Sequence, residues 1–366
     1  MMPSLQLDHL RLLFIKTRLD AAEFDLIRRL HELGLTLKVM CQPQGDHQRQ
    51  FLQEQDLLIE PQRRRGKLDP LFIRQIRGII RQHNINLIHA TDSTSLANAI
   101  WASYFTDVRL IGYRGTSARI RKSDPTYWLG ILHPKVKLIL CVSRSVYDYM
   151  KTVVEESRLR LNYKGFDANW VAPQAPVPDA FPVDPKQHFV GLFMGNSKGR
   201  PHKGLEVLIQ AFHQVSDPRS VLVVLGNFSQ EAARLAKQGP NRERIHLMGE
   251  HANATQWLAQ ADLYVQPSLQ EGLPRSVKEA MALSLPIIIT DIPGPTELVE
   301  HGSSALAVPA NQAEPLAQAW DRLAADPALR QQLGSAARTR LAQHFSATRF
   351  VDNTIAAYLD VLPPKP

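Results

Sequence analysis

Two carboxylates, Glu271 and Glu279, stand eight positions apart at the start of the stretch EGLPRSVKEAMALSLPIIIT. The first lies in a loop-like segment, and the second lies in a helical pattern that begins near Arg275. An apolar run then predicts a buried strand, and a Gly/Pro turn follows it. Open α/β folds bind ligands at the carboxyl ends of their parallel strands. The order of loop, helix, strand and turn therefore predicts a ligand site that includes both carboxylates.

A second polar segment lies upstream, in the sequence GNSKGRPHKG of residues 195–204. Arg200 and Lys203 come just before the amino end of a predicted helix. A helix amino end carries partial positive charge, so two cations and a dipole would converge on one phosphate pair. Arginine forks onto phosphate oxygens, whereas lysine is a point charge. The alternative interpretation is an ordinary basic loop on the surface.

Strand-like runs alternate with helical patterns along the chain, which predicts repeated βαβ units and parallel sheets. In the first half the predicted strands are Arg11–Ile15, Leu35–Cys41, Leu87–His89, Val108–Ile111, Val136–Val142 and Arg158–Leu161. In the second half they are Phe189–Met194, Val221–Leu225, Ile245–Leu247, Leu263–Val265, Pro286–Thr290 and Ala305–Val308. The predicted helices include Ala21–Leu33, Leu71–Gln82, Pro315–Ala324, Pro327–Phe345 and Ala347–Leu362.

A length of 366 residues predicts about two domains. The Pro-rich segment 173–185 has no helical period and is interpreted as a stiff linker between them. Cys41 and Cys141 lie in apolar runs without metal-ligand spacing, which indicates reduced core thiols in a cytosolic protein. No run approaches the ~20 apolar residues of a spanning helix, and no signal peptide is predicted. We therefore expect a cytoplasmic protein.

With these motifs in place, the chain resembles the retaining glycosyltransferases of family 4. The resemblance covers nearly the whole chain and is strongest over residues 188–310. It rests on the E-x7-E pair, on the R-P-x-K-G element within residues 195–204, and on the strand ADLYVQPS that leads into Glu271. LIHATD, LILCVSRSV and YKGFDANWV match more weakly in the first half.

The resemblance implies an α/β protein of GT-B fold, with two Rossmann-like doubly wound domains that face each other across a cleft. The amino-terminal, acceptor-side domain would span residues 1–172. The donor-binding domain would span residues 183–345, and a last helix within 346–366 would return to the first domain. The implied reaction moves a sugar, with retention, from a nucleotide-diphosphate sugar to a glycan, lipid-linked or lipopolysaccharide-type acceptor. The alternatives are a GT-B epimerase or phosphorylase and an inactive GT-B binding protein.

The resemblance also implies residue roles. Glu279 would bind the ribose hydroxyls, and Glu271 the hydroxyls of the donor sugar. Arg200, Lys203 and Glu271 would form the catalytic group, because fixed cations stabilise a departing diphosphate. No metal or other cofactor is expected, since cations take the place of a metal. The donor-binding set is Gly195, Lys198, Arg200, Lys203, Glu271, Gly272, Leu273 and Glu279. The alternatives are a solvent-facing helix carboxylate at 279 and a helix-terminal charge at 271.

The first half departs from the family pattern. The first strand is followed by a turn, Lys16 to Asp20, that lacks the usual glycines. Arg114 precedes Gly115 where the family commonly has His-Gly, and Asn196 stands where the family often has Arg. Lys16, Arg18, His89 and Arg114 are therefore the candidate acceptor-side residues. His89 is as compatible with a structural role as with a catalytic one, and Ser143 is best interpreted as a helix N-cap.

The net charge of +8 lies wholly in the first half: residues 1–180 have 26 Lys+Arg against 18 Asp+Glu, and residues 181–366 have 17 against 17. The cluster Arg63–Arg65 precedes a helical pattern with Leu71, Phe72, Ile76, Ile79 and Ile80 near one face. This suggests peripheral contact with an anionic membrane face. A core-facing helix with a solvated basic side is the favoured alternative. No nucleic-acid recognition motif is present, so no nucleic-acid partner is expected.

Overall fold

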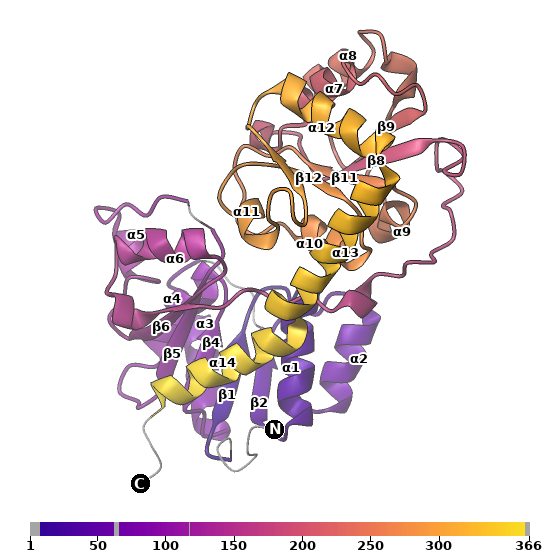
Figure 1. Ribbon diagram of the computed structural model, residues 1–366. Coiled ribbons are helices and arrows are strands. Elements are labelled where there is room, and N and C mark those ends of the chain that lie inside the picture. The colour runs from indigo at the N-terminus through magenta and orange to yellow at the C-terminus, as the bar shows by residue number, and fades with distance from the viewer. Residues whose placement is uncertain (1–7, 62–65, 117, 363–366) are drawn as a thin grey trace. The chain divides into compact units, whose positions relative to one another are not determined.

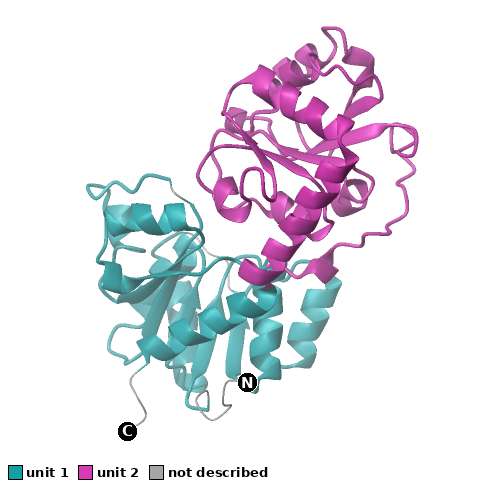
Figure 2. Ribbon diagram, in the orientation of Figure 1, with its two compact units in different colours: residues 1–165, 347–366 teal, residues 166–346 magenta. Residues whose placement is uncertain are grey.

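The computed structural model describes residues 8–61, 66–116 and 118–362. The chain divides into two compact units, which Figure 2 colours separately. Unit 1 comprises Met1–Gly165 with Ala347–Pro366, and unit 2 comprises Phe166–Ser346. Each unit is an α/β body with a parallel sheet, so the doubly wound α/β class predicted from sequence is confirmed.

Unit 2 takes in residues 166–185, which the sequence assigns to the end of the first domain and to a linker. Local contacts explain this difference. The Phe166 amide donates to the Phe345 carbonyl at 2.9 Å. Gln260 Nε2 donates to the Ala175 carbonyl at 2.8 Å, and the Phe181 ring lies 5.3 Å from the Trp257 ring. The Pro-rich segment is therefore attached to unit 2.

In the described part of unit 1, seven parallel strands form one sheet in the order β3-β2-β1-β4-β5-β6-β7 (Figure 1). The strands are β1 (Arg11–Ile15), β2 (Thr36–Met40), β3 (Leu58–Ile59), β4 (Leu87–Ala90), β5 (Arg109–Arg114), β6 (Val136–Cys141) and β7 (Leu159–Leu161). The helices are α1 (Ala21–Glu32), α2 (Asp46–Glu54), α3 (Pro70–Gln82), α4 (Ser93–Ala102), α5 (Pro125–Trp128), α6 (Arg144–Lys151), the 3-10 turn η2 (Glu156–Arg158) and α14 (Ala347–Val361).

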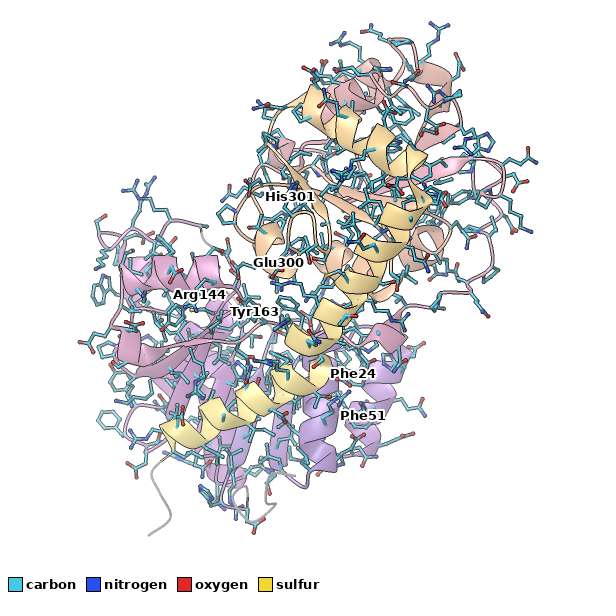
Figure 3. The ribbon with its side chains drawn as sticks, viewed as in Figure 1. Phe24, Phe51, Arg144, Tyr163, Glu300 and His301 are labelled. Carbon is cyan, nitrogen blue, oxygen red and sulfur yellow. The ribbon has the colours of Figure 1, made fainter. Side chains whose placement is uncertain are left out.

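This strand order determines which face of the sheet each helix of unit 1 covers. The chain moves from β1 outward to β3 and then returns to β4, so right-handed crossovers place α3 and α4 opposite α1. Packing agrees, because α3 contacts α4 whereas α1 contacts α14. The rings of Phe24 and Phe51, labelled in Figure 3, lie 5.5 Å apart and join α1 to α2.

Helix α14 completes unit 1. The Tyr358 hydroxyl lies 2.8 Å from His89 Nδ1 of β4, and Asn162 Nδ2 donates to Thr354 Oγ1 at 2.8 Å. The Arg160 guanidinium and the Asp360 carboxylate form a salt bridge. The last helix therefore supplies core and polar contacts to a sheet formed by the first 161 residues.

Helix α3 is interpreted from sequence either as a membrane-contacting helix or as a core-facing helix with a solvated basic side. Phe72, Ile76, Ile79 and Ile80 are buried within unit 1, so this face is core-facing. Leu71 is 66% exposed and does not share that face. The residues Arg63–Arg65 of the basic cluster lie outside the described part of the chain. In the described part of the chain, no helix has the length and apolar character needed to cross a membrane.

Unit 2, all of whose residues the structure describes, has a six-stranded parallel sheet in the order β10-β9-β8-β11-β12-β13 (Figure 1). The strands are β8 (Phe189–Met194), β9 (Ser220–Leu225), β10 (Ile245–Gly249), β11 (Leu263–Gln266), β12 (Ile287–Thr290) and β13 (Leu306–Val308). The helices are α7 (Leu205–Phe212), α8 (Gln230–Ala236), α9 (Ala254–Leu258), α10 (Arg275–Ala282), α11 (Pro295–Leu298), α12 (Ala313–Ala325) and α13 (Pro327–His344), with 3-10 turns η3 (Ala168–Trp170), η4 (Pro201–Lys203) and η5 (Arg242–Arg244).

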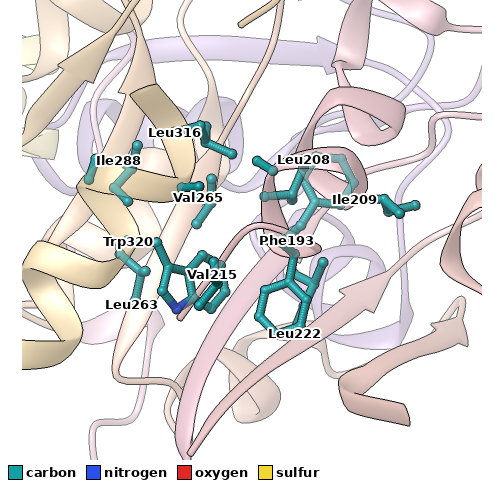
Figure 4. Packing of buried hydrophobic residues seen from close by; sticks show 14 of the residues in the cluster. Phe193, Leu208, Ile209, Val215, Leu222, Leu263, Val265, Ile288, Leu316 and Trp320 are labelled. Atoms are coloured by element: carbon teal, nitrogen blue, oxygen red, sulfur yellow. The ribbon is translucent and has the colours of Figure 1, made fainter. Parts of the chain in front are cut away.

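The core of unit 2 is organised around Trp320 of α12 (Figure 4). Its indole is fully buried, and its Nε1 donates to Ser220 Oγ at 2.9 Å. A Cβ on Gly191 of β8 would lie 1.9 Å from the indole ring. Glycine at this position therefore lets the indole pack directly on the backbone of the central strand, which holds β8 and its following loop in place.

Candidate functional site

The loop after β8 is anchored by its backbone. The Gly195 amide donates to the Leu225 carbonyl at 2.9 Å. The Ser197 and Lys198 amides donate to the Asn227 carbonyl at 2.7 and 3.0 Å. The Asn227 amide in turn donates to Asn196 Oδ1 at 2.8 Å, so Asn196 helps to fix the loop. The Lys198 and Arg200 side chains are exposed on this fixed backbone.

Gly204 turns the same loop into α7. Its φ is +73°, and an added Cβ would lie 1.9 Å from the Pro267 carbonyl oxygen. Both facts require glycine, because left-handed backbone is costly for other residues. The Leu269 amide donates to the His202 carbonyl at 2.7 Å, which joins the loops after β8 and β11. The first amides of α7 donate to no side chain of unit 2, so this helix end is uncapped.

Lys203 and Glu271, which the sequence predicts in one site, form a salt bridge with Nζ 2.5 Å from Oε1. The two side chains are only 20% and 12% exposed. Ser268 Oγ and Gln266 Nε2 also donate to Glu271 Oε1, at 3.0 and 3.2 Å. One carboxylate oxygen thus receives three donors, and the cation and the carboxylate are held side by side at the carboxyl end of β11.

The backbone around Glu271 packs against the turn after β12. Gly294 has φ +101°, and a Cβ there would lie 2.0 Å from the Gly272 carbonyl oxygen. Only glycine permits this approach. Gly272 and Leu273 are half-buried beside it. The Gly/Pro turn predicted from sequence therefore supports the loop that carries Glu271.

Glu279 lies on α10, which begins at Arg275 as predicted. The residue is 8% exposed, and its carboxylate forms a salt bridge with Arg275 Nε at 2.9 Å. Burial raises the pKa of Glu279 against the opposing charges of Arg275 and Lys278. Both Glu279 and Glu271 add to the rise in the pKa of Tyr264, a rise caused mainly by burial, so both carboxylates lie near that phenol.

A cavity of about 490 Å³ opens at the carboxyl ends of β8 and β9. Among its lining residues are Gly195, Asn196, Glu250 and His251. Sequence analysis missed Glu250 and His251, although both follow strand β10 at the edge where parallel sheets bind ligands. It also missed Gln266 and Ser268, which follow the same rule at β11. Each of these residues lies at or just after the end of a strand, and that position is the sequence feature that could have identified it as a site residue.

The arrangement in unit 2 can bind an anion beside a polyhydroxyl group. Lys203, the exposed Arg200 and the uncapped end of α7 offer positive charge, and Glu271 and Glu279 offer acceptors for hydroxyls. Within the residues that the structure describes, no three His, Cys, Asp or Glu side chains gather as a metal site requires.

On the acceptor side, Lys16 lies in an internal ion network rather than in a free turn. Its Nζ lies 2.5 and 2.6 Å from the two carboxylate oxygens of Glu23, which is 2% exposed. Lys164 pairs with Asp20 and lies 3.2 Å from Glu23. Burial opposes the shift, but the charges of Lys164 and Lys16 hold the pKa of Asp20 down at about 2. These contacts favour a structural role for Lys16, while Arg18 is exposed in the same turn.

His89 is buried at the end of β4, with its ring 4.9 Å from Phe14 and 5.7 Å from Tyr358. Burial, with the positive charges of Lys16 and Lys164, lowers the pKa of His89 to about 3. Its imidazole is therefore neutral near pH 7 and packed in the core, which favours the structural interpretation. Arg114 lies apart from it, on a cavity at the end of β5. Ser143 caps α6 by accepting from the Val146 amide at 3.2 Å, as predicted.

Two family models match the chain. Residues 188–326 match the model described as "Glycosyl transferases group 1", and residues 24–170 match "Glycosyltransferase Family 4". The chain is 27% identical over 340 residues to "Lipopolysaccharide core biosynthesis glycosyltransferase LpsD" of Rhizobium meliloti (strain 1021), with 92% of each chain covered.

Solved structures show the same fold. A glycosyltransferase from Rickettsia africae ESF-5 superposes with a TM-score of 0.80 at 17% identity, covering 98% of this chain and 100% of that chain. Anabaena Alr3699/HepE, whose structure was solved in complex with UDP-glucose, superposes with a TM-score of 0.76 at 19% identity, covering 97% and 100%. At these identities the likeness establishes the GT-B fold. Because the models match both halves and the relative spans the chain, this protein belongs to the family 4 glycosyltransferases.

Proposed function

We propose that the chain transfers a sugar from a nucleotide-diphosphate sugar to a saccharide acceptor, with retention of the anomeric configuration and without a metal ion. The acceptor is a glycan or a lipid-linked or lipopolysaccharide-type saccharide. The likeness to the Rhizobium meliloti lipopolysaccharide core enzyme supports this acceptor class. Family membership supports the retaining course. The UDP-glucose complex of the Anabaena protein supports a nucleotide-sugar donor.

The observation that carries the proposal is the contact of 2.5 Å between Lys203 and Glu271, beside the uncapped end of α7. The pair holds a cation where a diphosphate would lie against the helix end, and a carboxylate where sugar hydroxyls would donate. When the glycosidic bond breaks, negative charge grows on the leaving diphosphate. A cation already fixed in position stabilises that charge more than it stabilises the substrate, which lowers the barrier.

The remaining residues have distinct roles in this proposal. Arg200, exposed on the anchored loop, adds a second cation to the diphosphate, and Lys198 lies close enough in sequence to assist. Glu279 accepts hydrogen bonds from the ribose hydroxyls once the Arg275 guanidinium has moved away from the Glu279 carboxylate. The cavity bordered by Gly195 and His251 holds the base. We assign no protein general base.

The location is also part of the proposal. We place the protein in the cytoplasm, with peripheral contact to an anionic membrane face through its basic first half. The net charge of +8 over residues 1–180 supports this, because anionic lipid attracts clustered cations. Sedimentation with anionic and neutral liposomes at low salt tests it, and equal binding to both would contradict it.

Calorimetric titration with UDP, GDP, ADP and CMP in the presence of EDTA is the first test of the donor site. We expect one nucleoside diphosphate to bind in the micromolar range without metal. Binding that appears only after a divalent ion is added would contradict the metal-free assignment. The NMR coupling constant of the product anomeric proton then tests retention. A product formed from the donor alone, with no acceptor, would instead indicate an epimerase.

A further inference from the structure

A second cavity, of about 460 Å³, lies within unit 1 at the carboxyl ends of β4 and β5. Its volume is within the range of small-molecule sites. Its polar lining includes the cations Lys67 and Arg114, the carboxylate Asp92 and the hydroxyls of Thr91, Ser93 and Thr126. All of its lining residues belong to unit 1, whereas the proposed donor-site residues belong to unit 2.

The charges on this lining are not balanced. Among the described residues no carboxylate forms an ion pair with Arg114, whose Nη2 donates to the Ala118 carbonyl. Burial lowers the pKa of Arg114, and the opposing effects of Tyr127, Tyr149 and Cys141 are smaller. Lys67 Nζ donates to the Thr126 carbonyl at 3.1 Å. A partly buried guanidinium without a counter-charge is unfavourable unless a ligand supplies one.

The single carboxylate on the lining is already engaged elsewhere. Asp92 Oδ1 accepts from the Ser95 amide at 2.8 Å and caps α4. Asp92 Oδ2 accepts from the Thr17 amide at 2.9 Å, and from the Thr17 and Ser95 hydroxyls at 3.1 and 2.8 Å. Its acceptor capacity therefore serves the fold, and Arg114 gains no bond from it.

Two buried polar atoms at this cavity lack hydrogen-bond partners. One is Arg114 Nε and the other is Thr91 Oγ1, and Thr91 is only 9% exposed. Buried donors and acceptors in folded proteins nearly always have partners. Thr91 follows β4 and Arg114 ends the neighbouring strand β5, and both residues line this cavity. A guanidinium and a hydroxyl together match an oxygen-rich anion.

We propose that this cavity binds the anionic group of the acceptor, and that the acceptor is an acidic sugar that carries a carboxylate or a phosphate monoester. Arg114 donates from Nε to one anion oxygen, Thr91 Oγ1 donates to it as well, and Lys67 adds a point charge. The hydroxyls of Ser93 and Thr126 face the rest of the sugar ring. The identification of this ligand as the acceptor rests on the proposed transferase function. The anion site itself rests on the cavity.

The test compares three free sugars at fixed ionic strength: glucose 6-phosphate, glucuronic acid and neutral glucose. Titration of the whole protein, followed by NMR or calorimetry, is expected to show binding of at least one acidic sugar and none of glucose. The acidic sugar that binds identifies the group as phosphate or carboxylate. Equal binding of glucose and both acidic sugars would overturn the proposal, as would no binding of any of them.

The variant Arg114→Gln is expected to weaken acidic-sugar binding roughly tenfold or more, because a charge-assisted bond is lost. Arg109→Gln is the matched control, since it removes the same charge from the other end of β5 and should bind as the wild type does. Unchanged binding in Arg114→Gln would overturn the proposal.

Thr91→Val provides an independent variant if Arg114→Gln fails to fold. It keeps the side-chain shape and deletes a hydroxyl that has no protein partner, so we expect unchanged or higher thermal stability with weaker acidic-sugar binding. A purely structural role for Thr91 would leave acidic-sugar binding unchanged, which would overturn the proposal. Nucleoside diphosphate titration of the same samples separates the two proposals. Acidic-sugar binding without nucleotide binding would refute the transferase proposal alone, whereas nucleotide binding without acidic-sugar binding would refute the anion site alone.

Discussion

The two units have the same strand order, but the loops after their first strands differ in the contacts that their cations make. In each sheet the first strand is central, the next two strands extend to one side, and the fourth strand lies on the other side of the first. The loop after the first strand therefore occupies the same topological position in both units. In unit 1 this loop is the short turn from Lys16 to Asp20, and in unit 2 it is the glycine-containing loop of residues 195–204.

The difference lies in how each loop employs its cations. Lys16 is paired with Glu23 within unit 1. In unit 2, Arg200 is exposed, and Lys203 is paired with Glu271, a carboxylate that we propose also binds the donor sugar. In the described part of unit 1, the cation without a counter-charge is Arg114 of β5, two strands along the sheet from β1. A topological switch point therefore supplies a location, and the side chains decide whether that location binds a ligand or is closed by internal ion pairs.

The largest effect is expected from Lys203→Ala. Loss of a preorganised cation at a developing charge costs roughly 10²–10³-fold in turnover. The variant should keep the thermal stability of the wild type, because its partner Glu271 retains the donors Ser268 and Gln266. Turnover of the nucleotide sugar found by calorimetry is the measurement, and Lys237→Ala, which changes an exposed lysine of unit 2 outside the proposed site, is the control. Wild-type turnover in Lys203→Ala would remove Lys203 from the site.

Lys164→Met is the counterpart in unit 1 and should act on stability. It removes one of two cations beside the buried Glu23, and breaking such a cluster costs about 3 kcal/mol. Urea unfolding measures the loss, and Lys186→Met, an exposed lysine, should change stability by no more than about 0.5 kcal/mol. Nucleotide affinity should not change at temperatures where both proteins are folded. A variant that weakens nucleotide binding without loss of stability would reverse the contrast between the units.

Gly204→Ala tests the close approach that shapes the donor loop. The variant must place a Cβ in left-handed backbone and against the Pro267 carbonyl, so we expect a loss of about 2–3 kcal/mol. Gly199→Ala is the matched control, because Gly199 has a similar φ of +70° but no atom within 4 Å of the added Cβ. It should lose only about 1 kcal/mol. Equal losses in the two variants would mean that backbone conformation alone, without the contact, accounts for the effect.

A smaller effect is expected from pH in unit 1. The folded state lowers the pKa of His89 to about 3 from 6.5, so the unfolded chain binds the proton first as pH falls. The stability from neutral His89 is complete above pH 6.5 and is lost on acidification toward pH 3. Between pH 6.5 and 5 this amounts to about 2 kcal/mol. Urea midpoints at both pH values should move less in His89→Phe than in the wild type. Equal shifts of the urea midpoint in His89→Phe and the wild type would show that His89 does not titrate in this way.

Much of the fold is predictable from sequence because both central strands are apolar on both faces. β1 and β8 have the predicted bounds, since runs such as RLLFI and FVGLFM are buried on either side. β3, which spans only Leu58–Ile59 and is half-buried at a sheet edge, has no period to detect and was missed. The burial of the apolar face of α3 was predicted, but the exposure of Leu71 was not.

The candidate site was predictable to the extent that residue type and strand position determine it. The family resemblance of the sequence placed Lys203 and Glu271 in one site, and the two side chains are in contact. The partners of Lys16 could not be inferred in the same way. Its neighbour Glu23 is buried only because α1 packs on the sheet, and Lys164 reaches the cluster from 144 positions beyond Asp20. Sequence spacing cannot indicate that a turn cation is neutralised by a residue so distant.

Helix α14 has a consequence for how the protein is made. Unit 2 is one continuous stretch, so it can fold completely as soon as residue 346 has left the ribosome. Unit 1, although its sheet is translated first, lacks α14 until residue 361 emerges, and until then His89 and Asn162 lack the partners that Tyr358 and Thr354 provide. We expect the half translated first to be the half that folds last. A nascent chain released at residue 346 would carry a finished unit 2 beside an incomplete unit 1.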